Sequence, residues 1–206
     1  MKQQFVETIK IKNGKALALP YHQARMDRTI SHLVSISNLK TISHFSFLIS
    51  HLESLLSPKP EMDLYKARVV YGAEGVELVE YAPYQMRTIR SLKVVEDDEI
   101  DYTYKSTDRS QLNALAAQKG DCDEIIIMKN GLLTDTSFTN LALYDGSSWL
   151  TPKHPLLHGT KRAQLLEAGI IREADLTLED LKRAQKVSLF NAMIDFGECE
   201  VSEIIL

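Results

Sequence analysis

The chain carries two informative segments, Tyr104-Lys105-Ser106-Thr107-Asp108-Arg109 and Leu133-Thr134-Asp135-Thr136-Ser137-Phe138-Thr139-Asn140. The first places a lysine just before a predicted helix, and the second places a carboxylate just after a predicted hairpin. A lysine amine can bond covalently to an aldehyde, and a carboxylate can keep a nitrogen base protonated. Lys105 and Asp135 are therefore the first candidates for chemistry.

Lys105 has neighbours that could make its amine nucleophilic. An ordinary lysine has a pKa of about 10.4 and stays protonated at neutral pH. Tyr102 and Tyr104 make its setting partly apolar, and Arg109 follows one helical turn later, so burial near a cation would lower that pKa. The alternatives are a surface lysine at this position and, for Asp135, a turn or a helix cap. Residue type alone leaves these alternatives open.

Three further segments predict an anion site. Gly159-Thr160-Lys161-Arg162 would open a helix, whose first amides and dipole favour an anion. Asn191-Ala192 follows a predicted strand, and Arg25 could supply a planar, bidentate cation. The alternatives are helix punctuation at Gly159 and a solvated helix face at Arg25. A lysine, an acid and a phosphate anchor are together what pyridoxal 5'-phosphate (PLP) requires of a protein.

The composition excludes several classes of protein. The 206 residues include 44% hydrophobic and 25% charged residues and carry a net charge of −4, as ordinary globular chains do. No basic cluster or long apolar run stands out, so nucleic acid and membranes are not expected partners. Pro155 between His154 and His158 argues against a helical metal pair. Two cysteines form no framework and no secretion signal precedes Phe5, so we expect a cytoplasmic protein.

Apolar periodicity and turn signals predict an α+β fold. Asn13-Gly14 lies in a hairpin over Phe5–Leu19, and Asn130-Gly131 and Asp145-Gly146 mark two more. The segment from Thr177 resembles a capping box that opens a helix. The other predicted helices cover His22–Asn38, Thr41–Leu56, Asp108–Lys119 and Thr160–Ala168, and the other predicted strands cover Leu64–Tyr71, Val76–Tyr81, Arg87–Val95, Glu124–Met128, Gly131–Thr134, Asn140–Tyr144, Trp149–Thr151 and Val187–Phe190. An acidic linker at Glu96–Glu99 predicts an N-terminal domain over residues 1–98 and a C-terminal domain over residues 99–206.

The order of these segments resembles the class IV aminotransferases, the PLP enzymes of fold type IV. Phe5-Val6-Glu7-Thr8 is similar to the family's Phe-Glu-Thr, and His22-x-x-Arg25 is similar to its His-x-x-Arg. Lys105-Ser106 matches its Lys-Ser pair. The segment from Thr134-Asp135 through Asn140-Leu141 resembles the family's Thr-Glu-x-x-x-x-Asn-Leu, and Gly159–Arg162 resembles its Gly-Ile-Thr-Arg. Asn191-Ala192 and Arg109 resemble the 4-amino-4-deoxychorismate lyase branch of the family.

The resemblance implies a small N-terminal α+β domain and a C-terminal pseudo-barrel domain, with PLP between them. Lys105 would bind PLP as a Schiff base, Asp135 would face the ring nitrogen and Arg109 the phenolic oxygen. The residues implied to hold the phosphate or complete the cofactor site are Arg25, Asn140, Thr160, Lys161, Asn191 and Ala192. A homodimer and a small amino substrate are implied as well.

Two departures from the family bear on function. Asp135 stands where the family has the longer glutamate, and Met1–Gln4 replaces a segment that in the family usually ends in Gly-Asp-Gly. The resemblance still implies a lyase that eliminates pyruvate to give p-aminobenzoate, on the way to folate. The alternatives are an aminotransferase of the branched-chain or D-amino acid type, and a non-catalytic member that acts as a dimeric binding module.

Overall fold

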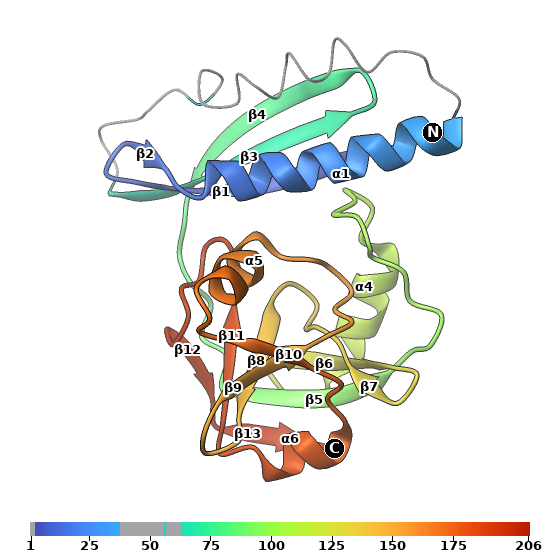
Figure 1. Ribbon diagram of the computed structural model, residues 1–206, viewed down its shortest axis with the longest axis vertical. Coiled ribbons are helices and arrows are strands. Elements are labelled where there is room, and N and C mark those ends of the chain that lie inside the picture. Colours follow the sequence, from blue (N-terminus) through green and yellow to red (C-terminus); the bar gives the residue numbers. More distant parts are fainter. Residues whose placement is uncertain (1–2, 38–55, 57–62) are drawn as a thin grey trace. The chain divides into compact units, whose positions relative to one another are not determined.

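The computed structural model describes residues 3–37, Leu56 and 63–206 (Figure 1). The helix predicted over Thr41–Leu56 lies outside these residues except for its last one. The chain forms two compact units, one of Met1–Gln85 with Tyr104–Asp108 and one of Met86–Thr103 with Arg109–Leu206. It therefore passes from one unit to the other at three points. The predicted linker at Glu96–Glu99 lies within the second unit. The boundary between domains of residues 1–98 and 99–206 stays a prediction.

The first unit is built on an antiparallel sheet. Its strands are β1 (Phe5–Lys12), β2 (Lys15–Ala16), β3 (Leu64–Gly72) and β4 (Gly75–Pro83), in the order β2-β1-β3-β4. Asn13 and Gly14 have φ angles of 50° and 74°, the pair of left-handed residues that a two-residue hairpin turn requires. The hairpin predicted at Asn13-Gly14 is confirmed.

Helix α1 (Leu19–Ser37) supplies the other layer of this unit (Figure 1). Its buried side chains recur every three or four residues, so one stripe of the helix faces the sheet. They are His22, Arg25, Met26, Thr29, Ile30 and Leu33. The helix begins three residues before the predicted start at His22, because Pro20 in the first turn needs no backbone donor.

The short segment Tyr104–Asp108 joins the first unit through backbone hydrogen bonds. Val6 N donates to the carbonyl of Lys105 at 2.9 Å, and Thr107 N donates to the carbonyl of Gln4 at 3.0 Å. Phe5 and Ser106 form an antiparallel bridge between these two bonds. The backbone of Lys105 is therefore fixed beside the first strand of the chain, about a hundred residues away in sequence.

The second unit contains two sheets of mixed strand direction. One has the order β13-β5-β6-β7 and the other the order β10-β9-β8-β11-β12. Curled together with few helices, they form the expected pseudo-barrel, and the α+β prediction is confirmed. The elements are β5 (Ser91–Glu96), α4 (Ser110–Ala116), β6 (Glu124–Lys129), β7 (Leu132–Leu133), β8 (Asn140–Tyr144), β9 (Trp149–Pro152), α5 (Thr160–Glu167), β10 (Arg172–Ala174), α6 (Leu178–Arg183), β11 (Lys186–Phe190), β12 (Cys199–Val201) and β13 (Glu203–Ile205), with a 3₁₀ turn at Ala117–Lys119.

Local signals in this unit account for most of its elements. Asn130 and Gly131 have φ angles of 52° and 74°, so the second Asn-Gly hairpin is confirmed. Thr177 and Asp180 form the predicted reciprocal capping box of α6. The three-residue strands β10, β12 and β13 were not predicted, because such short, largely exposed strands carry no clear apolar alternation. The strand predicted over Arg87–Val95 is shorter and covers Ser91–Glu96.

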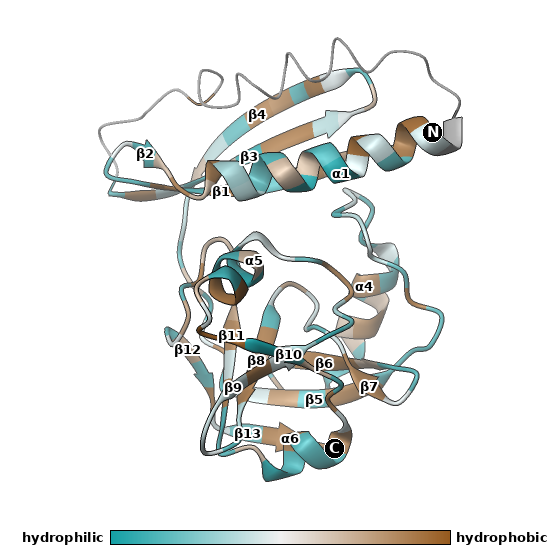
Figure 2. Cartoon of the chain, in the orientation of Figure 1, coloured by the Kyte–Doolittle hydropathy of each residue, from teal (hydrophilic) through white to brown (hydrophobic). Residues whose placement is uncertain are grey.

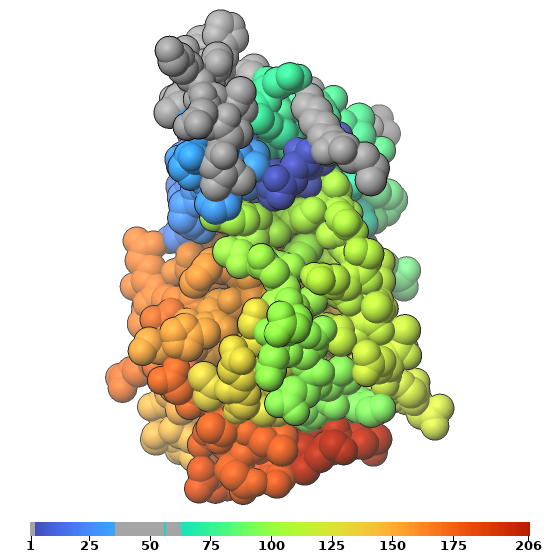
Figure 3. Space-filling model, turned by 90° about the vertical axis from the view of Figure 1, so that its right-hand side faces the viewer, coloured from blue at the N-terminus to red at the C-terminus, as the bar shows by residue number. Residues whose placement is uncertain are grey.

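In the second unit, the polarity of each element matches its burial. Figure 2 shows hydrophobic residues along β6, where Ile125, Ile126 and Ile127 are fully buried, and hydrophilic residues on α6. The C-terminal residues lie at the surface (red in Figure 3), and Leu206 is 59% exposed. Among the described residues, no helix is long and apolar enough to cross a membrane.

Candidate active site

The first unit places Lys105 beside a buried cluster of charged and polar side chains. Val6 N holds the Lys105 carbonyl, and the next residue of β1 is Glu7. Arg25 Nε donates to Glu7 Oε1 at 2.8 Å, and Arg25 Nη2 donates to Glu7 Oε2 at 2.5 Å. His22 Nδ1 lies 2.5 Å from the same Oε2. The structure thus brings Lys105 and Arg25 into one unit, together with Glu7 and His22.

Charge pairing decides the ionisation of this cluster. Burial by itself would raise the pKa of Glu7, but the Arg25 charge and the His22 contact bring it down to about 2. Burial lowers the pKa of His22, and the hydrogen bond to Glu7 offsets only part of this effect. The charges of Arg25 and Lys105 lower the His22 pKa further. At neutral pH Glu7 is therefore ionised and His22 is neutral.

In the second unit, Asp135 is a buried carboxylate that accepts hydrogen bonds from two neutral donors. It follows β7 and is 4% exposed. Asn140 Nδ2 donates to Oδ1 at 2.7 Å, and Leu157 N donates to Oδ2 at 2.8 Å. Burial raises the pKa of Asp135 to about 7, although both hydrogen bonds and the Arg162 charge act in the opposite direction. A cation placed against this carboxylate would favour its ionised form.

Asn140 connects Asp135 to the chain that enters α5. Its amide also donates to the carbonyl of Leu157 at 2.9 Å. Gly159 lies directly before α5, and a Cβ there would overlap the Asn140 side-chain oxygen. Any larger residue at 159 must therefore displace the Asn140 side chain. In this structure Asn140 positions Asp135 and the start of α5.

The start of α5 offers groups that suit an anion. Thr160 is 3% exposed, and among the described residues its Oγ1 has no hydrogen-bond partner. The first amides of a helix have no intrahelical acceptor and carry the positive end of its dipole. Lys161 Nζ lies 2.5 Å from Asp195 Oδ1, beyond β11, so its charge is already paired.

Asn191 shapes the loop that follows β11. Its Oδ1 accepts hydrogen bonds from Met193 N at 2.8 Å and from Ile194 N at 3.0 Å. Its Nδ2 donates to the carbonyl of Phe138 at 3.2 Å. Ala192 lies inside this turn. The Asn191 side chain is thus used for its own loop and for the segment after Asp135.

Arg109 holds the same segment from another element. It is the N-cap residue of α4, so the helix starts two residues later than predicted. Its Nη2 donates to the carbonyl of Ser137 at 2.8 Å, and its guanidinium stands 5.8 Å from the centre of the Tyr102 ring. Arg109 and Asn191 together fix the residues that follow Asp135.

Comparison with known proteins assigns the chain to a family. Residues 4–200 match the family described as amino-transferase class IV. The chain belongs to the class IV aminotransferases. An uncharacterized protein of Haemophilus influenzae is 38% identical over 187 residues, which cover 91% of this chain and 96% of the relative.

Two further relatives of this class IV aminotransferase have names that suggest a reaction. A candidate aminodeoxychorismate lyase of Schizosaccharomyces pombe is 31% identical over 127 residues, which cover 57% of this chain and 54% of the relative. A solved structure, that of a candidate 4-amino-4-deoxychorismate lyase from Haemophilus somnus 129PT, is 34% identical with a TM-score of 0.81. That match covers 95% of this chain and 98% of the other.

Class IV aminotransferases depend on PLP, and the residues present here fit that cofactor. A buried carboxylate with a raised pKa suits a ring nitrogen that carries a proton, and Asp135 is such a group. A buried hydroxyl without a partner at a helix start suits a phosphate, and Thr160 is such a group. Lys105 would supply the amine that the aldehyde requires.

Sequence reasoning missed two side chains that pair with predicted site residues. Glu7 pairs with Arg25, and Asp195 pairs with Lys161. Glu7 had a detectable signal, because it is a charged residue in the apolar alternation of Phe5, Ile9 and Ile11. Asp195 lies in a loop, where an aspartate is ordinary and no periodicity marks it.

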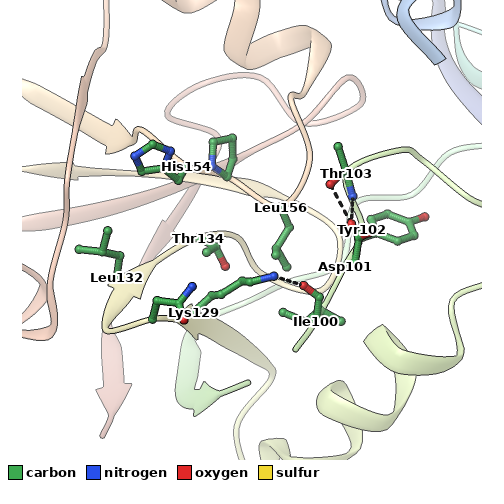
Figure 4. Close-up of a pocket in the computed structure, with 11 residues that line it drawn as sticks. Ile100, Asp101, Tyr102, Thr103, Lys129, Leu132, Thr134, His154 and Leu156 are labelled. Atoms are coloured by element: carbon green, nitrogen blue, oxygen red, sulfur yellow. Dashed lines mark hydrogen bonds between the residues drawn. The ribbon is translucent and has the colours of Figure 1, made fainter. Parts of the chain in front are cut away.

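A separate pocket of about 270 Å³ lies in the second unit (Figure 4). None of the predicted site residues is among its lining residues, although Thr134 precedes Asp135. Its polar groups are engaged with the protein, since Lys129 Nζ donates to the Ile100 carbonyl at 2.6 Å and Thr134 Oγ1 to the Ile127 carbonyl at 2.7 Å. Across the described residues, no His, Cys, Asp and Glu group of three or more could hold a metal ion.

The contact between Gly159 and Asn140 predicts a dependence between the two positions. Gly159→Ala should destabilise the protein by about 1–3 kcal/mol, because the new Cβ must displace the Asn140 side chain. In an Asn140→Ala background the same substitution should cost much less, since the overlapping atoms are gone. Urea unfolding of the four proteins measures this coupling, and an equal cost in both backgrounds would contradict the packing described.

The buried Asp135 carboxyl predicts a pH-dependent stability of the protein without cofactor. Between about pH 4 and pH 7 the folded state keeps a proton that the unfolded state has lost, so the free energy of unfolding falls as pH rises. Asp135→Asn should abolish this decrease in the free energy of unfolding, which is on the order of 4 kcal/mol over that pH range. Unfolding curves across this pH range test it, with Glu96→Gln on an exposed residue as the control. Parallel wild-type and Asp135→Asn profiles would refute the assignment.

Proposed function

We propose that this member of the class IV aminotransferase family is a PLP-dependent lyase. It would act on 4-amino-4-deoxychorismate and release pyruvate and p-aminobenzoate. The observation that carries the use of PLP is the Asp135 carboxylate, which is buried, accepts from two neutral donors and has a raised pKa. A protonated ring nitrogen is the cation that such a site favours. PLP, when bound, supplies an aldehyde for the substrate amine and a ring that withdraws electrons from the substrate carbon.

Lys105 would bind the cofactor and then move protons. Its backbone is held by Val6, so its amine starts from a fixed point on β1. The Lys105 amine, when it is not bonded to the cofactor, would take the proton from the substrate carbon and return it to the pyruvate fragment that leaves. Asp135 would hold the proton on the ring nitrogen throughout, with Asn140 and Leu157 keeping the carboxylate in place.

The phosphate would be held by groups that differ in kind. Thr160 would donate its hydroxyl and backbone amide, and Arg25 would supply a cation. The Asn191 side chain is occupied in its own turn, so Asn191 and Ala192 would act through the backbone. Lys161 would contribute after weakening its pair with Asp195.

The choice of a lyase has its own support. Two relatives carry names of candidate lyases of this type, and Asn191-Ala192 and Arg109 resemble that branch. Arg109 also contacts the residues after Asp135, where it could reach the ring's phenolic oxygen. The other reactions of the family remain outcomes of the tests below. A homodimer and a cytoplasmic location stay predictions as well.

The attachment of PLP to Lys105 is tested by chemical trapping. Wild-type protein incubated with PLP and reduced with borohydride should carry one adduct, on the peptide that contains Lys105, as peptide mass mapping reports. Lys105→Ala should abolish the adduct, whereas Lys153→Ala, at an exposed lysine outside the proposed site, should retain it at Lys105. Labelling of another amine in the wild type, or none, would defeat the PLP proposal and favour a non-catalytic binding module.

The reaction is tested with 4-amino-4-deoxychorismate as substrate. A lyase should form p-aminobenzoate and pyruvate in equal amounts without added keto acid, because elimination needs no amino acceptor. Fluorescence of p-aminobenzoate and a coupled assay for pyruvate follow the two products. Lys105→Ala is the control for uncatalysed decay. Strict dependence of turnover on 2-oxoglutarate would identify an aminotransferase instead.

A further inference from the structure

Glu7 occupies an unusual place for a carboxylate. It lies in the buried row of β1 with Phe5, Ile9 and Ile11, and its exposed fraction is 0%. The same core contains apolar residues of α1, including Met26. A carboxylate in such surroundings is costly unless charged and hydrogen-bonding partners meet it.

Both oxygens of Glu7 are used. Arg25 contacts them at two points, through Nε at 2.8 Å and Nη2 at 2.5 Å, which fixes the plane of its guanidinium. Oε2 also lies 2.5 Å from His22 Nδ1. Since Glu7 is ionised and His22 neutral, His22 donates its Nδ1 proton to Glu7. His22 Nε2 is then an acceptor, and among the described residues it has no hydrogen-bond partner.

This cluster adjoins the lysine through the strand itself. Val6, one residue before Glu7, donates to the Lys105 carbonyl. Successive residues of a strand point to opposite faces, so Val6 and Glu7 serve different neighbours from one fixed backbone. The Lys105 charge is also among the causes that lower the pKa of His22.

Stability alone is a weak explanation for the cluster. Buried ion pairs contribute little net stability, and well-packed apolar residues in their place are often neutral or stabilising. Arg25 offers five N–H groups, and Glu7 takes two of them along one edge. Because the guanidinium is planar, the Glu7 pair therefore sets the orientation of the whole group.

We propose that Glu7 is a positioning residue, which holds the Arg25 guanidinium in the orientation that binds the phosphate of the cofactor. This inference rests on the proposed function. It assigns to Glu7 an effect on recognition of the phosphate group, beyond any effect on folding.

The test compares PLP with pyridoxal, which lacks the phosphate. Equilibrium dialysis of the protein with each compound gives two dissociation constants, and their ratio isolates the contribution of the phosphate. Glu7→Gln should reduce the preference for PLP by about tenfold, because the Arg25 cation loses its two-point charged partner. Glu80→Gln, which removes the exposed partner of Arg68 in the same sheet, should leave the preference unchanged.

A second variant protects the test from misfolding. Glu7→Asp keeps the charge and shortens the side chain, so it should give a folded protein with an intermediate preference. Circular dichroism and urea unfolding verify each protein. An unchanged preference for PLP in folded Glu7→Gln or Glu7→Asp would overturn the inference. A purely structural role of Glu7 would weaken the binding of PLP and of pyridoxal by the same factor. Failure of the wild type to capture PLP at Lys105 would instead overturn the proposed function.

Discussion

The antiparallel pairing between the start of β1 and the segment around Lys105 is the constraint on which the arrangement of this chain depends. Val6 and Gln4 hold Lys105 and Thr107 through backbone hydrogen bonds, and Phe5 bridges Ser106 between them. The residues on either side of this segment belong to the second unit. The backbone of Lys105 is thus fixed by a strand that lies far from it in the sequence.

Two buried carboxylates show how partners determine chemistry at equal burial. Glu7 faces a guanidinium and an imidazole, and its pKa falls to about 2. Asp135 faces an amide and a backbone N–H, and its pKa rises to about 7. The first carboxylate is permanently charged and suited to orienting neighbours. The second is easily protonated and suited to a partner that brings its own positive charge.

Local rules predicted the parts of the fold that local energy decides. Asn-Gly pairs adopt left-handed turns, and the Thr177 capping box closes on itself, so sequence sufficed for both. Strand β13 depends on pairing with β5, which lies far earlier in the chain, and β10 and β12 are so short that their own residues hardly favour them. The resemblance to the class IV aminotransferases supplied the pseudo-barrel, which periodicity alone could not.

The candidate site shows the same contrast between features that local sequence predicts and features that only the fold determines. Residue type and spacing marked Lys105, Arg25, Asp135 and Thr160 as candidates and the resemblance to the family implied their roles, but neither identified their partners. Glu7 meets Arg25 only because β1 and α1 pack together, and Asp195 meets Lys161 only because a loop after β11 reaches α5. Asn140 joins Asp135 to the loop before α5, and its predicted part in the cofactor site stays a prediction.

The pairing of β1 with residues beyond position 100 has a consequence for biosynthesis. A chain emerging from the ribosome presents β1, α1, β3 and β4 first, yet the edge beside Phe5 stays open until Ser106 has been made. The N-terminal portion must therefore wait for later sequence before its last backbone bonds close. Contacts so distant along the chain slow folding, and the nascent polypeptide exposes an unfinished strand edge in the interval.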